Sequence, residues 1–279
     1  MINISILISA CNEQANLPIS LRSCSFADRV FVLDSGSTDK TNEIAEAHGA
    51  QVVYHPWEGY ARQKNWGLDN LPFGTAWIFI LDADEEITPL LRDELIAIST
   101  GKVVTEKVAF YVNRYFVWQG KEIRHCGYYP SWNLRFFRKG KARYEERDVH
   151  EHMMGDGPVG YLRGEMRHED LRGLDYMWQK HLRYAELEAK EMVKIIAGYA
   201  KTGIKPSFLG NALERRRAVK ERIWPYLPAR WLFRFLYMCV FKKGFLDGAA
   251  GLDICLFMAR YEKEISRKFN ENKSAITTY

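Results

Sequence analysis

This chain of 279 residues lacks the features typical of secreted, repetitive or disulfide-bonded proteins. Its five cysteines are odd in number and include no Cys-x-x-Cys pair. That pattern argues against a disulfide framework or a zinc site and favours reduced thiols in the cytoplasm. We expect no signal peptide, because Met1 leads almost directly into a strand-like apolar segment. The sequence also has no internal repeat and no low-complexity tract.

A glycine-rich phosphate loop is also missing near the amino terminus. After the first apolar segment comes Ala10-Cys11-Asn12-Glu13, where a nucleotidyltransferase would normally carry glycines and a basic residue. A nucleotidyltransferase of similar α/β fold is therefore only an alternative function for this chain.

Acidic residues stand at the ends of two apolar segments. Asp82 and Asp84 directly follow a segment at residues 76–81, and Asp34 follows one at residues 29–33. Open α/β folds bind ligands at the carboxyl ends of their parallel strands. A hard cation such as Mg²⁺ or Mn²⁺ takes one or two carboxylates from protein and completes its shell with phosphate and water. The acid pair therefore predicts a site for a metal and a diphosphate.

Strand-like and helix-like patterns alternate along the first hundred residues. Strands are predicted at 3–9, 29–33, 51–54 and 76–80, and helices at 14–22, 40–48 and 58–71. Asp39 can cap the second helix and Gly49 can end it. Such short connections imply βαβ units and a mainly parallel sheet. Further strands are predicted at 109–118 and 132–138 and in a segment ending at His168.

Four motifs in this order resemble family 2 glycosyltransferases of the GT-A fold, a Rossmann-like α/β fold. They are Ser9-Ala10-Cys11-Asn12-Glu13, Leu33-Asp34-Ser35-Gly36-Ser37-Thr38-Asp39, Ala61-Arg62-Gln63-Lys64-Asn65-Trp66-Gly67 and Leu81-Asp82-Ala83-Asp84-Glu85-Glu86. Later segments resemble the bacterial branch of lipopolysaccharide-core β-1,4-glucosyltransferases: Trp132-Asn133-Leu134-Arg135-Phe136-Phe137, Asp148-Val149-His150-Glu151 and Gly244-Phe245-Leu246-Asp247-Gly248. The resemblance implies a metal-dependent, inverting transfer of a hexose. The implied donor is a UDP-sugar, UDP-glucose first, and the implied acceptor is a glycolipid or polysaccharide precursor such as lipopolysaccharide core.

The resemblance also implies a division of the chain. We expect a catalytic domain at 1–170, with a nucleotide-binding half at 1–100 and an acceptor half at 101–170. A length of 279 residues allows one such domain plus an appendage. Beyond Asp170, apolar residues recur every three or four positions, which predicts a helical region at 171–279.

The implied nucleotide-sugar site is built from the amino-terminal motifs. Asn12 and Glu13 would lie beside the base and ribose. Asp34 would accept the imide N–H of uracil, a hydrogen bond that its charge strengthens. The full set is Ala10, Asn12, Glu13, Asp34, Ser35, Arg62, Lys64, Asn65, Asp82, Ala83 and Asp84. Taken singly, Asp34 is also a typical turn residue, and Arg62 and Lys64 suit a solvated helix face.

Metal binding and catalysis are implied for a second group of residues. Asp84 would hold Mg²⁺ or Mn²⁺ between the two phosphates. His168 is a second candidate ligand, and a satisfied buried histidine is the alternative. Inversion needs a carboxylate that takes the proton of the acceptor hydroxyl. Glu151 best matches the family's acidic motif, although His-Glu replaces the usual Glu-Asp, and Asp148 is the second choice.

The acceptor would contact the middle of the chain and the first helix after it. The candidates are Trp132, Arg135, His150, Lys180 and Tyr184. Each has an ordinary structural alternative: Arg135 can cover an aromatic face, His150 can be a core histidine, and the last two can be plain helix surface.

The net charge of +5 is unevenly distributed. Residues 205–243 hold ten basic and two acidic residues, a net charge of +8, which leaves −3 for the rest. Apart from Arg234, aromatic and apolar residues fill positions 231–241, too few to span a bilayer, which needs about 20. This combination favours peripheral attachment to the inner face of the cytoplasmic membrane over nucleic-acid binding. A core helix with a basic outer face is the alternative. A non-catalytic membrane binder would leave the four motifs unexplained.

Overall fold

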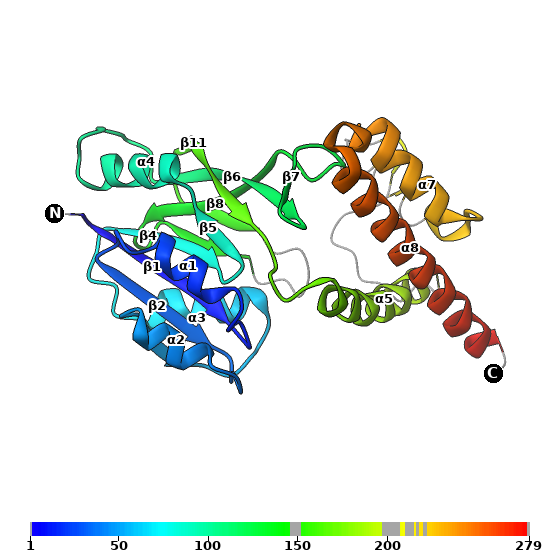
Figure 1. Ribbon diagram of the computed structural model, residues 1–279, viewed down its shortest axis with the longest axis horizontal. Coiled ribbons are helices and arrows are strands. Elements are labelled where there is room, and N and C mark those ends of the chain that lie inside the picture. Colours follow the sequence, from blue (N-terminus) through cyan, green and yellow to red (C-terminus); the bar gives the residue numbers. More distant parts are fainter. Residues whose placement is uncertain are drawn as a thin grey trace. The chain divides into compact units, whose positions relative to one another are not determined.

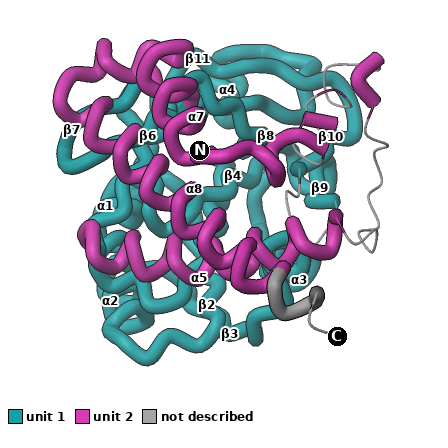
Figure 2. The backbone as a smooth tube through the Cα atoms, turned by 90° about the vertical axis from the view of Figure 1, so that its right-hand side faces the viewer, with its two compact units in different colours: residues 1–124, 128–172 teal, residues 125–127, 173–279 magenta. Residues whose placement is uncertain are grey.

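The chain divides into two units, which Figure 2 colours separately. Unit 1 comprises residues 1–124 and 128–172, and unit 2 comprises residues 125–127 and 173–279. The computed structural model describes residues 2–145, 152–196, 207–209, 215, 218–219 and 222–277.

Unit 1 is built on one mixed sheet with the strand order β3-β2-β1-β4-β8-β6-β11-β5, and β7 pairs with β6 (Figure 1). β1 is parallel to both β2 and β4, and β3 is parallel to β2. β8 runs antiparallel to both β4 and β6, while β11 is parallel to β6 and antiparallel to β5. The strands are β1 (Ile4–Ala10), β2 (Arg29–Asp34), β3 (Gln51–Tyr54), β4 (Trp77–Asp82), β5 (Glu85–Ile87), β6 (Ala109–Trp118), β7 (Lys121–Ile123), β8 (Ser131–Arg138) and β11 (Val159–His168). A separate hairpin pairs β9 (Ala142–Tyr144) with β10 (Met153–Gly155).

Alternation along the strands supplies two hydrophobic cores in unit 1. Ile6 and Ile8 of β1 join one core with Leu17 of α1 and Leu91 of α4, whereas Leu7 joins the other core with residues of α3. Successive side chains of a strand point to opposite faces, so a buried strand needs an apolar residue at every position. The helices of this unit are α1 (Leu17–Ser23), α2 (Thr41–Ala47), α3 (Tyr60–Asn70) and α4 (Pro89–Ser99).

The α/β architecture with carboxyl-terminal helices, predicted from the sequence, is confirmed. Its nucleotide-binding half, β3-β2-β1-β4, is the parallel part of the sheet, and insertion of β8 between β4 and β6 makes the whole sheet mixed. Four strands of only three residues, β5, β7, β9 and β10, were not predicted. Three residues are too few to show a period.

Unit 2 is helical and has its own core. Ala185, Ala189 and Met192 of α5 pack against residues of α8 that include Tyr261 and Ile265. The elements are α5 (Leu174–Ile196), η1 (Trp224–Tyr226), α7 (Arg230–Leu236), η2 (Tyr237–Phe241), η3 (Gly244–Asp247) and α8 (Gly248–Thr277). Within the described ranges, no helix is both long and apolar enough to span a bilayer.

One basic residue of the charged segment belongs to this helical core. Arg230 is buried, and its Nε and Nη2 donate to the Ser266 hydroxyl at 3.0 and 2.8 Å. Its guanidinium also lies 3.4 Å from the Glu262 carboxylate of α8. For Arg230, the alternative of a core helix therefore holds, because its side chain links α7 to α8.

The glycine motif at 244–248 is explained by packing inside unit 2. A Cβ on Gly244 would lie 2.8 Å from the sulfur atoms of both Cys126 and Cys255. Asp247 accepts from the backbone N–H of His125 at 2.8 Å, and its other oxygen lies 2.7 Å from the Nδ1 of that residue. The motif therefore holds residues 125–127 in place.

Candidate active site

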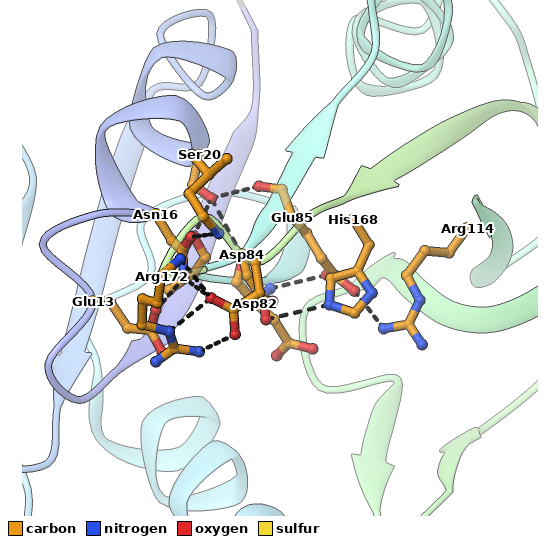
Figure 3. A network of polar contacts seen from close by, with 12 residues as sticks. Glu13, Asn16, Ser20, Asp82, Asp84, Glu85, Arg114, His168 and Arg172 are labelled. Carbon is orange, nitrogen blue, oxygen red and sulfur yellow. Dashed lines mark hydrogen bonds and ion pairs between the residues drawn. The ribbon is translucent and has the colours of Figure 1, made fainter. Parts of the chain in front are cut away.

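Asp82 ends β4 and Asp84 lies in the tight turn that leads to β5, at the carboxyl end of the parallel strands (Figure 3). The hydroxyl of Ser20 in α1 fixes this turn, because it bonds to the carbonyl oxygens of Ala83, at 2.8 Å, and Glu85. The turn thus presents both carboxylates at the sheet edge where α/β proteins bind ligands.

Two cations hold the Asp82 carboxylate. Lys64 of α3 donates to one of its oxygens at 2.6 Å, and Arg135 of β8 donates to the other at 2.7 Å. The same Arg135 nitrogen also donates to Glu85 at 2.9 Å, as does Arg114 at 2.9 Å. Burial opposes ionisation of Asp82, but the Arg135 and Lys64 charges outweigh it and hold the pKa of Asp82 well below its usual range.

Two of the predicted binding residues, Arg135 and Lys64, therefore form ion pairs within the protein. Arg135 is only 4% exposed, and the contacts that the structure gives it are with the acids of the nucleotide half. Its Nε and Nη1 are buried and have no hydrogen-bond partner among the residues that the structure describes. Lys64 is likewise buried and reaches only Asp82 among the described ion pairs. The proposed acceptor contact of Arg135 and the diphosphate contact of Lys64 stay predictions.

The structure brings together the two residues assigned to the metal. His168 lies opposite Glu85 in the antiparallel pairing of β11 with β5, so its Nε2 comes within 3.2 Å of the Asp84 carboxylate. Within the described part of the chain, no cluster of three or more His, Cys, Asp or Glu side chains could enclose a metal. One carboxylate and one imidazole suit a cation that keeps positions for phosphate and water.

Asp34, which was predicted to accept a hydrogen bond from uracil, stabilises the loop that follows β2. Asp34 is buried at the end of β2 and accepts from the backbone N–H groups of Gly36 and Ser37, both at 3.0 Å. Asn12 has a φ of +56° and accepts from the backbone N–H of Thr38 at 2.8 Å. The bond between Asn12 and Thr38 links the first two motifs. The bonds that Asp34 accepts are those expected of a turn residue, which was the alternative to uracil recognition. Contact with uracil stays a prediction.

Glu13 belongs to a polar network that the sequence did not reveal. Arg172 donates to Glu13 at 2.7 Å from 159 positions away, and Asn16, the residue before α1, donates at 2.7 Å. Burial raises the pKa of Glu13 to about 7, although Arg172 and Asn16 both oppose the shift. Arg172 also pairs with Asp170 at 2.6 Å. No local pattern marks Arg172, because its partners are distant in sequence.

The remaining nucleotide-site candidates have different surroundings. Asn65 exchanges two hydrogen bonds of 3.0 Å with the backbone of Tyr144, which anchors β9 to α3. Ser35 accepts from the Gln63 side chain at 3.1 Å. Arg62 is exposed on α3, and Ala10 is the buried last residue of β1. Of these four, Arg62 alone presents a long charged side chain to solvent.

The catalytic and acceptor candidates are only partly described. Asp148, His150 and Glu151 lie outside the described residues. Trp132 is exposed on β8 and meets Tyr161 edge to face, with ring centroids 5.0 Å apart. Lys180 and Tyr184 belong to α5 in unit 2, where Tyr184 packs against the helical core.

Sequence reasoning missed a carboxylate in the acceptor half. Glu165 of β11 accepts from Asn113 at 2.7 Å, Arg124 at 2.7 Å and Tyr129 at 2.8 Å. The hydrogen bond to Glu165 raises the pKa of Tyr129. Only the strand pattern was visible here, since the three partners come from three separate segments.

The chain is similar to several known proteins. The family model described as "Glycosyl transferase family 2" matches residues 5–160. The lipopolysaccharide core biosynthesis glycosyltransferase LpsC of Rhizobium meliloti (strain 1021) is 32% identical over 206 residues, 68% of this chain and 72% of that protein. An uncharacterized glycosyltransferase of Rickettsia felis (strain ATCC VR-1525 / URRWXCal2) is 42% identical over 259 residues, 88% and 84% of the two chains. Glucosyl-3-phosphoglycerate synthase of Mycobacterium tuberculosis, solved with Mn²⁺ and UDP, aligns with a TM-score of 0.43 at 18% identity, covering 73% of this chain and 82% of that chain.

The family model covers more than half of the chain, and it includes all four motifs that carry the resemblance. This match decides against the nucleotidyltransferase and the non-catalytic membrane binder. The chain is a glycosyltransferase and belongs to glycosyl transferase family 2.

Proposed function

We propose that this enzyme transfers a hexose from a UDP-sugar, UDP-glucose first, with inversion and with the help of Mg²⁺ or Mn²⁺. The observation that supports this best is the acidic turn after β4, where the Asp84 carboxylate lies 3.2 Å from His168. A divalent cation held there would offset the charge of the diphosphate and make UDP a better leaving group.

The residues around the turn fit distinct tasks in this proposal. Asp84 and His168 would hold the metal. Asp82 would accept from the ribose hydroxyls, since an acid balanced by Lys64 and Arg135 adds little negative charge beside a diphosphate. Asp34 would recognise uracil from the adjoining strand end.

The general base belongs to the acidic motif after β9. Glu151→Gln should lose transfer yet bind UDP-sugar and metal normally, because a base acts only as the acceptor proton moves and typically contributes about 10²–10⁴-fold. Asp148→Asn is the parallel variant. If Asp148→Asn is inactive while Glu151→Gln keeps more than about a tenth of wild-type turnover, the base is Asp148. If neither slows turnover at saturating substrate, the acceptor site lies elsewhere.

The proposed acceptor is a glycolipid or a cell-surface polysaccharide precursor such as lipopolysaccharide core. The likeness to LpsC, whose name specifies lipopolysaccharide core biosynthesis, supports it. We further propose that the enzyme works in the cytoplasm, attached to the inner face of the cytoplasmic membrane through unit 2. All five cysteines are free thiols, as is usual in reducing compartments. Exposed Trp231 and Phe241 with exposed Lys242 and Lys243 suit an anionic lipid surface.

Thermal melting with nucleotide and metal tests the donor proposal. At 100 times its Kd, a ligand that binds only the folded state stabilises it by about 2.7 kcal/mol. UDP with Mn²⁺ should therefore raise the melting temperature by roughly 5–10 °C, and ATP with Mg²⁺ should raise it much less. Asp84→Asn is the matched control and should lose the metal-dependent part of the shift. Equal shifts with both nucleotides would contradict the proposal. A screen of UDP-sugars for hydrolysis without acceptor would then identify the hexose.

A further inference from the structure

Unit 2 contains a cavity of about 1170 Å³ between α5, η1, α7, η2 and α8. This volume slightly exceeds the roughly 300–1,000 Å³ typical of ligand pockets. The described lining includes Met192 and Ile195 of α5, Ile265 of α8 and the aromatic residues Trp224 and Phe233. A space of this size and lining is suited to a ligand rather than to imperfect packing.

The apolar lining of this cavity is partly open to solvent. Leu236, which is 41% exposed, and Phe241, which is 77% exposed, both line it. Exposed apolar surface is unfavourable by about 25 cal/mol per Å² and marks interaction sites when it gathers in one place. Further large apolar side chains of α7, η2, η3 and α8 are exposed outside the lining: Trp231, Leu232, Val240, Phe245, Leu246, Leu252 and Leu256. Unit 2 therefore has exposed apolar side chains both in the lining of the cavity and outside it.

Among the described residues, two arginines, Arg215 and Arg234, line the cavity together with two acids, and one of the arginines has an unpartnered hydrogen-bond donor. This donor is the Nε of Arg234, which is buried and has no hydrogen-bond partner in the described part of the chain. The two acids of the lining are already engaged. Glu262 accepts from Trp224 at 3.1 Å, and Glu188 accepts from Tyr261 at 3.0 Å. A buried donor without a partner destabilises the fold by about 1–3 kcal/mol, so an anionic group beside Arg234 would be favourable.

We propose that this cavity binds one acyl chain of an anionic membrane phospholipid, with the lipid phosphate beside Arg234. An apolar chain matches the lining, and a phosphate matches the unsatisfied guanidinium. The surrounding exposed apolar residues, together with Lys242 and Lys243, favour a lipid of the membrane itself over the lipid part of a detached acceptor. The inference rests on the membrane association proposed above and gives it a specific site.

Lysolipid binding to the full chain tests the cavity directly. The probe is palmitoyl-lysophosphatidylglycerol below its micelle concentration, titrated by calorimetry. We expect one lipid per chain, and no binding of glycerophosphoglycerol, which lacks the chain. Leu236→Trp fills the cavity and should weaken binding at least tenfold. Leu232→Trp is the matched control, because Leu232 has the same 41% exposure on the same helix but does not line the cavity. Its affinity should stay within twofold of wild type.

Two further variants separate the chain from the phosphate. Ile195→Trp blocks the cavity from α5 and should reproduce the loss. Arg234→Gln should weaken binding of the anionic lysolipid about tenfold but leave monopalmitoylglycerol, which has the chain but no phosphate, within twofold, whereas Arg222→Gln, outside the lining, should change neither.

Three results would overturn the proposal. The first is wild-type affinity in both cavity-filling variants. The second is binding of glycerophosphoglycerol as tightly as of the lysolipid, which would indicate an anion site alone. The third is unchanged sedimentation of Leu236→Trp with phosphatidylglycerol vesicles, which would separate the cavity from membrane attachment. UDP affinity in the presence of Mn²⁺, measured on the same samples, tests the glycosyltransferase proposal independently, since these substitutions lie in unit 2.

Discussion

Replacing Arg135 tests whether the acidic turn depends on buried cations. In Arg135→Met, Asp82 and Glu85 lose the nitrogen that both accept from, at 2.7 and 2.9 Å. Removing one partner of a buried ion pair typically lowers the free energy of unfolding by about 3–5 kcal/mol, because a charge remains without compensation. Arg135→Lys keeps the charge but not the planar bridging group, so its effect should be intermediate.

The remaining contacts of the two acids indicate the size of the loss. Asp82 keeps Lys64 at 2.6 Å, and Glu85 keeps Arg114 at 2.9 Å. Each acid thus retains one cation, which places the expected loss near the lower limit, about 3 kcal/mol. For a protein of this size the melting temperature of unit 1 should fall by roughly 6–12 °C. UDP affinity should fall as well, because the turn that carries Asp84 becomes less well fixed.

Native-state hydrogen exchange on peptides from β4 and β8 measures the stability of unit 1 alone. Arg62→Met is the control, since Arg62 is an exposed arginine of the same unit, and its loss should stay within about 0.5 kcal/mol. A loss below about 1 kcal/mol in Arg135→Met would refute the idea that this cation offsets two buried carboxylates. A larger loss in Arg135→Lys than in Arg135→Met would refute the charge argument in particular.

Three further predictions concern the nucleotide side. Asp84→Ala should abolish metal-dependent transfer without altering the fold; a folded variant with normal activity would contradict the metal assignment. Asp34→Ala should raise KM for the donor more than it lowers kcat, and unchanged UDP affinity in calorimetry would count against uracil recognition. Burial raises the pKa of Glu13 from 4.5 to about 7, so the folded state binds more protons between these values and stability should fall as pH rises through that window. Urea unfolding of unit 1 at pH 5 and pH 7.5 should show a smaller pH dependence in Glu13→Gln, and an identical slope in both proteins would disprove the coupling.

The parallel half of the sheet could be predicted from the sequence because its signals are local. β3 and β6 begin and end at the predicted residues, and the predicted end of α2 at Gly49 agrees with its φ of +77°. Alternating apolar segments and helical periods need no knowledge of distant residues. The position of β8 between β4 and β6 depends on long-range pairing, and no local pattern encodes that.

The candidate site, too, could be predicted only where its signals are local in the sequence. Asp84 could be proposed because it follows a predicted strand, and His168 because an imidazole is an acceptable ligand for Mn²⁺; in the structure the two side chains lie 3.2 Å apart. The tie between Arg135 and Asp82 could not be proposed in the same way. Charge and residue type did not distinguish a buried arginine from one that contacts an acceptor, since the difference depends on which strand lies beside β4.

The charges around the turn explain why its two acids would do different work. Asp82 lies between Lys64 and Arg135, whose positive charges disfavour a divalent cation beside it. Asp84 is directed toward His168, which in its neutral form can serve as a ligand rather than a competing cation. The charges of Lys64 and Arg135 would also let Asp82 remain ionised next to a diphosphate. The fold thus separates two neighbouring carboxylates, two positions apart in sequence, into one suited to hydrogen bonding with sugar hydroxyls and one suited to a metal.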